Sequence, residues 1–114
     1  MAANKLKPQA EQNQWIDLTD AATINIDASL GKKFRVTIAG NRTFTISNVT
    51  AGMGFMLRIK QDATGGRTVT FFPTVSWPNN VIPTLSSGAN KADTFGFTAQ
   101  TNNTFDGFVV GQNA

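Results

Sequence analysis

The sequence predicts an all-β protein, a jelly-roll-like β-sandwich of about eight antiparallel strands. From Trp15 onward apolar and polar residues alternate with a period of two, and no segment sustains the 3.6-residue period of an amphipathic helix. Turns rich in Gly, Asn and Asp divide the apolar runs at spacings of about ten residues, which is typical of sandwiches and barrels. We therefore divide the chain into an extended N-terminal arm, residues 1–14, and a single sandwich domain, residues 15–114.

The first half of the domain contains three predicted strands, residues 22–27, 32–40 and 41–48. In the second of these the alternation places Phe34 and Val36 inward and Lys33 and Arg35 outward. The dipeptide Gly40-Asn41, between residues 32–40 and 41–48, is suited to a tight hairpin with positive φ. The sequence therefore predicts that the strands before and after this dipeptide pair with each other.

The second half repeats this pattern with more aromatic residues. Strands are predicted over residues 54–61 and 67–72, joined by a hairpin through "DATGG" at 62–66. Residues 73–90 hold three of the four prolines and predict a loop or short edge strands, because proline removes a donor from the strand ladder. Strands over 91–100 and 104–112, separated by the turn "TNN", complete the domain.

Several predicted strands carry an apolar residue on the outward face as well. These residues are Met56, Phe72, Phe108 and Val110. One exposed apolar side chain is ordinary, whereas four indicate a second buried surface, namely a contact between subunits. Trp77, in the proline-bracketed loop, either covers the open end of the sandwich or anchors a subunit contact.

The composition argues against an enzyme. Histidine and cysteine are both absent, which excludes a Ser-His-Asp arrangement and the commonest metal ligands. Asp17, Asp20 and Asp27 could meet at a calcium ion, but Asp20 and Asp62 fit turn-forming roles better. The sequence therefore predicts neither a catalytic residue, a metal nor a cofactor.

The charge pattern offers one basic cluster. The chain carries a net charge of +3, and Lys33 and Arg35 share a face of their predicted strand. That face is either simply solvated or contacts a negatively charged partner. Nucleic-acid binding would require denser basic residues with exposed aromatics between them. No run of apolar residues approaches the length of a membrane span, and the N-terminal residues do not form a secretory signal. We expect synthesis in the host cytoplasm.

Five motifs in residues 31–100 carry a family resemblance. They are the "GNRT" hairpin, the "SNVTAG" connector, the "KQDATGGRTVTF" hairpin, a "WP" loop ending in "PTLS", and the "DTFGF" strand. Together they resemble a β-sandwich module of tailed-bacteriophage structural proteins, found in capsid decoration (cement) proteins and in tail-fibre or receptor-binding proteins. The resemblance implies a sandwich that is commonly trimeric. The chain departs from fibre relatives at residues 101–105, where no tyrosine stands.

The short arm and the single domain favour a decoration protein that binds the outer surface of the phage head. We expect a virion protein that binds the head as a homotrimer and stabilises the shell by bridging subunits of the major capsid protein. The N-terminal arm is either a disordered tail or a segment that orders on this shell. The predicted capsid contacts are Leu6, Lys7, Pro8, Lys33 and Arg35, and the predicted subunit contacts are Met56, Phe72, Trp77, Phe108 and Val110. The alternative is a tail-fibre tip that recognises host surface glycans.

Overall fold

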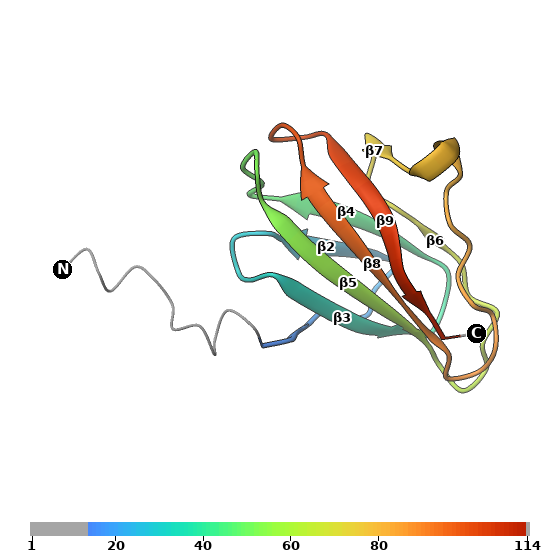
Figure 1. Ribbon diagram of the computed structural model, residues 1–114. Helices are drawn as coiled ribbons and strands as arrows, with labels where there is room; N and C mark the ends of the chain where they lie inside the picture. Colours follow the sequence, from blue (N-terminus) through green and yellow to red (C-terminus); the bar gives the residue numbers. More distant parts are fainter. Residues whose placement is uncertain (1–13, 114) are drawn as a thin grey trace.

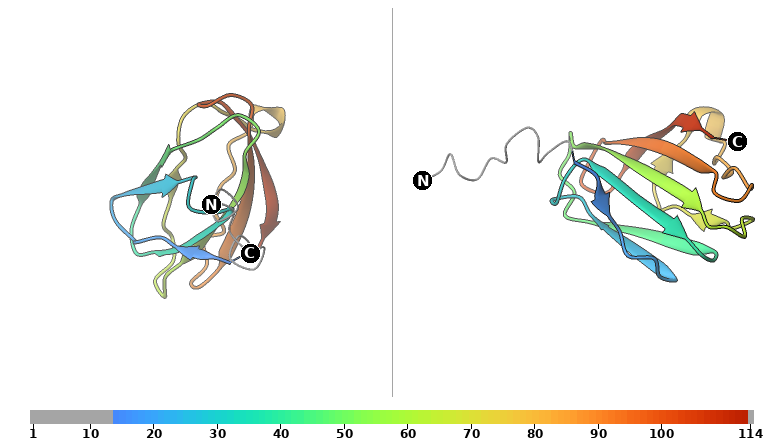
Figure 2. Two further views of the ribbon diagram at one scale, coloured as in Figure 1. Left: turned by 90° about the vertical axis from the view of Figure 1, so that its left-hand side faces the viewer. Right: turned by 90° about the horizontal axis from the view of Figure 1, so that it is seen from below.

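The computed structural model describes residues 14–113. Within these residues it contains nine strands in two sheets and one short 3-10 helix, η2 (Pro78–Asn80). The two sheets face each other across the core (Figures 1 and 2). The predicted arm, with Leu6, Lys7 and Pro8, lies outside the described residues.

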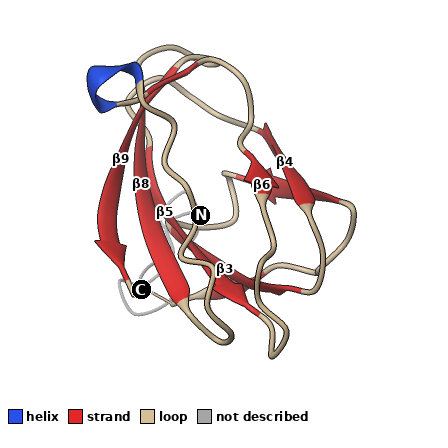
Figure 3. Ribbon diagram, turned by 90° about the vertical axis from the view of Figure 1, so that its right-hand side faces the viewer, coloured by secondary structure: helices blue, strands red, loops and turns tan. Residues whose placement is uncertain are grey.

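The larger sheet has six strands in the order β1-β3-β5-β8-β9-β7. Its bounds are β1 (Ile16–Asp17), β3 (Lys33–Ile38), β5 (Gly54–Gln61), β8 (Ala92–Ala99), β9 (Phe105–Gln112) and β7 (Val75–Ser76). The smaller sheet has the order β2-β4-β6, with β2 (Thr23–Asp27), β4 (Arg42–Ser47) and β6 (Val69–Thr70). Figure 3 shows the two sheets on opposite sides of the molecule.

The chain alternates between the sheets as it advances from β1 to β6. Each strand therefore pairs with the strand two places later in the sequence, and all of these pairs are parallel. Parallel pairing needs a crossover connection, and here the crossover is a strand of the opposite sheet. Only β5–β8 and β8–β9 are antiparallel, while β7 adds a further parallel pair on β9. The expectation of an antiparallel jelly roll is therefore wrong for most strand pairs.

The hairpins predicted at Gly40-Asn41 and at residues 62–66 are instead corners, where the chain passes from one sheet to the other. At Gly40-Asn41 the chain leaves β3 in one sheet and enters β4 in the other, so these strands do not pair. Asp20 holds this corner by accepting hydrogen bonds from Ala39 N (3.1 Å) and Arg42 Nε (2.7 Å). The segment 62–66 likewise carries the chain from β5 to the opposite sheet. The turn "TNN" is a true hairpin between β8 and β9, as predicted.

The faces predicted by the alternation are confirmed for the strands that became β3 and β8. Phe34, Val36 and Ile38 are buried on β3, and Phe95 and Phe97 are buried on β8. Aromatic rings form the centre of the core, with Phe55 stacked on Phe97 at a centroid distance of 5.2 Å and Phe72 4.9 Å from Phe97. Burying these side chains between two sheets fixes the outward faces, where the candidate sites lie.

Candidate functional site

Two surfaces combine exposure with specific chemistry: the outer face of the six-stranded sheet and a cleft at one end of the sandwich. The outer face carries the residues between the buried ones on β3, β5, β8 and β9. The strand register aligns Lys33, Met56, Gly96 and Phe108 in one row across this face. The next row contains Arg35, Arg58 and Thr94.

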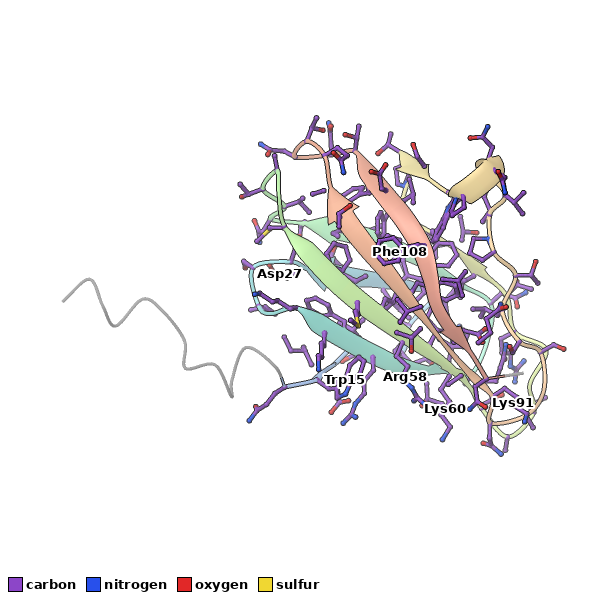
Figure 4. The ribbon with its side chains drawn as sticks, viewed as in Figure 1. Trp15, Asp27, Arg58, Lys60, Lys91 and Phe108 are labelled. Carbon is purple, nitrogen blue, oxygen red and sulfur yellow. The ribbon has the colours of Figure 1, made fainter. Side chains whose placement is uncertain are left out.

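The apolar patch consists of Met56 and Phe108 on this face and of Val110, which lies at the β-bulge two residues farther along β9. Their exposed fractions are 38%, 42% and 50%. The Phe108 ring lies against Gly96, where an added Cβ would come within 2.4 Å of ring atom Cε2. Glycine at this position therefore lets the aromatic ring lie across β8 toward β5, and Figure 4 shows Phe108 over this part of the sheet.

The basic strip borders the apolar patch and consists of Lys33, Arg35, Arg58 and Lys60. Trp15 lies beside it, with its ring centroid 5.6 Å from Lys33 Nζ and 5.8 Å from the Arg35 guanidinium carbon. Arg35 also donates to Asp17 Oδ1 at 2.6 Å. Figure 4 shows Trp15, Arg58 and Lys60 along one side of the sheet.

The cleft lies where β4 and β8 end and β5 and β9 begin. It has a volume of about 490 Å³, and its lining contains no charged residue. Three separate segments line it: residues 45–49, 72–74 and 102–103. Phe72 and Phe105 form its apolar base and are each only 2% exposed.

Hydrogen bonds between residues far apart in the sequence hold the rim of the cleft. Thr74 adopts a positive φ of 64°, a rare conformation for a β-branched residue, and its hydroxyl donates to the Asn103 carbonyl. Asn48 has a φ of 59° and donates to Asp27 Oδ1 at 2.9 Å. Asn102 Oδ1 accepts from Ala51 N at 3.0 Å. Sequence alternation could not find this cleft, because its walls come from loops far apart in the chain.

The predicted contact residues separate into two groups. Lys33, Arg35, Met56 and Phe108 share the outer face of the six-stranded sheet, and Val110 lies exposed at the β-bulge of β9. Phe72 does not lie on an outward face as predicted, because residues 71–74 are loop rather than strand and its ring packs into the aromatic core. Trp77 is 7% exposed and packs against Phe71 and Phe97, which matches a lid on the core.

Asp17, Asp20 and Asp27, which the sequence allows as calcium ligands, do not come together. Asp17 pairs with Arg35 and Asp20 with Arg42. Asp27 instead accepts hydrogen bonds from Ser29 N, Ser29 Oγ and Asn48 Nδ2. Within residues 14–113 no group of three or more acidic side chains could hold a metal ion. The same residues contain no helix with the length and apolarity that crossing a membrane requires.

Comparison with known families decides between the two phage roles. The model of the family described as "Putative phage tail fibre C-terminal domain" matches residues 16–94, more than half of the chain. The chain belongs to this family. No curated protein and no solved structure matches it.

Membership makes the protein a structural component of a phage tail fibre. The match covers β1 through β7 and the first residues of β8, and so includes the basic strip. It favours the alternative raised from the sequence over the capsid decoration protein, a role that nothing in the comparisons supports. The tail-fibre domain therefore presents an uncharged cleft and a basic, partly apolar sheet face.

Proposed function

We propose that this tail-fibre domain recognises glycans on the host surface and binds them in the uncharged cleft. The observation that carries the proposal is the chemistry of the rim, which offers amide and hydroxyl groups and no charge. Sugar hydroxyls both donate and accept hydrogen bonds, as do these groups. A volume of about 490 Å³ lies within the range of ordinary ligand pockets.

Two amide donors at the rim are unused. The side-chain oxygens of Asn102 and Asn103 accept hydrogen bonds from Ala51 N and Thr101 Oγ1. Within residues 14–113 neither side-chain NH₂ group donates to an acceptor, so both remain available to a ligand. The bonds at the oxygens and the positive φ of Thr74 hold the rim in place before a ligand arrives, which lowers the entropic cost of binding.

The decisive experiment changes these donors and leaves the acceptors intact. Asn102→Asp and Asn103→Asp keep an oxygen for Ala51 N and Thr101 Oγ1 but replace the NH₂ donor with a second oxygen. Asn41→Asp is the matched control, because Asn41 Oδ1 accepts from Thr68 N at 3.0 Å far from the cleft. Binding is measured on an array of purified bacterial lipopolysaccharides and capsular polysaccharides.

We expect the unmodified protein to bind at least one polysaccharide on the array. The two cleft variants should weaken that binding about tenfold, which corresponds to loss of about 1.4 kcal/mol. Asn41→Asp should bind as tightly as the unmodified protein. Failure to bind any member, or equal losses in all three variants, would contradict the proposal.

We further propose that the domain is a homotrimer held by the apolar patch of Met56, Phe108 and Val110. Clustered exposure of large apolar side chains on one face supports a subunit contact. Phe108→Glu should convert a trimeric mass to a monomeric one in sedimentation equilibrium. Thr23→Glu, which places the same charge on the opposite sheet, should remain trimeric. A monomeric unmodified protein at about 100 µM would overturn this assignment, because specific subunit interfaces bind more tightly than this.

A further inference from the structure

The basic strip is a concentration of positive charge that the rest of the fold leaves unneutralised. Its four cations, Lys33 and Arg35 on β3 and Arg58 and Lys60 on β5, alternate with buried apolar residues and so all face outward. The parallel register places Arg35 directly opposite Arg58. Neighbouring strands lie about 4.8 Å apart, and like charges placed opposite each other destabilise a sheet.

The carboxylates that could balance these cations are used elsewhere. Asp20 and Asp62 pair with Arg42 and Arg67. Three further carboxylates accept hydrogen bonds from uncharged groups. Asp27 accepts from Ser29 and Asn48, Asp93 from Ser86, and Asp106 from Gln100.

Asp17 alone, among the acids of residues 14–113, forms an ion pair with a member of the strip. The strip therefore keeps a net charge of about +3, from four cations and one carboxylate. Arg58 and Lys60 form no ion pair in the described part of the chain.

Trp15 supports the strip from one side. Its ring contacts both Lys33 and Arg35 at cation–π distances, so it helps to order these two long side chains, and Arg35 is also held by Asp17. A shallow depression of about 270 Å³ lies among Asp17, Arg35, Thr37, Arg58 and Lys60. An anionic group entering it would meet two guanidinium groups and one ammonium group, which form charge-assisted hydrogen bonds.

We propose that the basic strip binds an acidic polysaccharide, a sugar polymer that carries phosphate or carboxylate groups. The proposal rests on the proposed function in one respect, that the partner is a polymer of the host surface. The residues that would bind it are those of the strip and not those of the cleft. A sheet face suits an extended chain, since Arg58 and Lys60 stand about 7 Å apart along β5 and could contact successive anionic groups. Nucleic acid fits less well, because binding of single strands uses several exposed aromatic rings. Beside the strip itself stands Trp15, whose ring is already contacted by Lys33 and Arg35.

The test compares the loss of one positive charge in the strip with a charge change of the same size on the opposite sheet. Lys60→Gln removes one positive charge from the strip, whereas Thr23→Glu lowers the net charge by the same amount at an exposed position of β2 in the opposite sheet. Arg58→Gln tests the neighbouring cation. Binding to purified wall teichoic acid, which bears phosphate, and to polygalacturonate, which bears carboxylate, is measured by biolayer interferometry at 20 and 200 mM NaCl. Neutral dextran and a single-stranded DNA oligonucleotide are run in parallel.

We expect binding to at least one acidic polymer, with Lys60→Gln and Arg58→Gln each weakening it about fivefold and Thr23→Glu less than twofold. Raising the salt should weaken binding strongly, because condensed counterions are released when a polyanion binds. Phosphate is the preferred group if teichoic acid binds more tightly, and carboxylate if polygalacturonate does.

Three results would overturn the proposal: no binding to either acidic polymer, equal effects of Lys60→Gln and Thr23→Glu, or tighter binding to DNA than to both polysaccharides. The cleft variants Asn102→Asp and Asn103→Asp separate the two proposals. They should leave binding to acidic polymers unchanged, so failure of either site is recognised independently of the other. Thermal unfolding of every variant confirms that the fold is retained.

Discussion

The side chain of Gln61 pairs with the backbone of Arg67 as a neighbouring strand would. Gln61 Nε2 donates to the Arg67 carbonyl at 2.9 Å, and its Oε1 accepts from Arg67 N at 3.0 Å. The same Nε2 donates to the Ser86 carbonyl at 3.1 Å. Gln61 is 1% exposed, so one buried amide connects the end of β5 to two separate loops.

Gln61→Met should therefore destabilise the domain by about 3 kcal/mol, because it leaves polar backbone groups unpaired in a buried setting. Urea unfolding followed by tryptophan fluorescence measures this loss. Gln100→Met is the control: Gln100 is exposed and donates to Asp106 at 2.8 Å, so we expect a loss of about 0.5 kcal/mol or less. Equal losses would show that the Gln61 amide does not connect the loops.

Gly65 and Gly66 offer a matched pair in one turn. Both have a φ of 74°, but an added Cβ at Gly65 would lie 2.6 Å from the Ser87 carbonyl oxygen, whereas at Gly66 it would meet nothing within 4 Å. Gly66→Ala should cost about 1 kcal/mol, the strain of a left-handed backbone alone. Gly65→Ala should cost about 3 kcal/mol or more, since it adds overpacking against rigid backbone.

Urea denaturation of these two glycine variants measures the difference directly. A cost at Gly65 no larger than that at Gly66 would show that the loop around Ser87 moves freely.

Gly107 lies under the Trp77 lid. A Cβ there would come within 2.8 Å of Trp77 Cζ3 and 2.7 Å of Val75 Cγ1. Gly107→Ala should destabilise the domain by about 2 kcal/mol and change the near-ultraviolet circular dichroism of the tryptophan. Gly111→Ala, on the same strand with open space around it, should leave both the stability and the spectrum unchanged. An unchanged spectrum in Gly107→Ala would contradict this packing.

Stability should fall in acid and stay level near neutral pH. The hydrogen bond from Arg42 lowers the pKa of Asp20, and that from Arg67 lowers the pKa of Asp62. The hydrogen bond from the Ser29 hydroxyl lowers the pKa of Asp27. A lowered pKa in the folded state stabilises the fold above the unfolded pKa of about 4, and this contribution is lost as pH falls through the folded pKa.

Urea unfolding at pH 7, 5 and 3 should give similar free energies of unfolding at the first two values and a lower one at pH 3. The sequence contains no histidine, so no side chain with an ordinary pKa titrates between pH 5 and 8. In Asp62→Asn the decrease between pH 5 and pH 3 should be smaller. A decrease that begins above pH 6 would point to another group.

The sequence by itself determined the all-β class and which side chains face the core. Phe34, Val36 and Ile38 are buried as predicted, and Lys33 and Arg35 alternate with them on the outward face, because alternation depends only on the local geometry of an extended strand. The β8–β9 hairpin was predictable for the same reason, since its short polar turn lies between two strong strands.

Only the tertiary structure decided which strands pair and which residues meet. Alternation has the same period in parallel and antiparallel strands, and a Gly-Asn dipeptide suits both a hairpin and a corner between sheets. At Gly40-Asn41 two long-range hydrogen bonds select the corner: Ala39 N donates to Asp20 Oδ2, and Thr68 N donates to Asn41 Oδ1. The parallel register then brings Arg58 beside Arg35, and three distant loops form the cleft, because strand pairing depends on contacts between residues far apart in the chain.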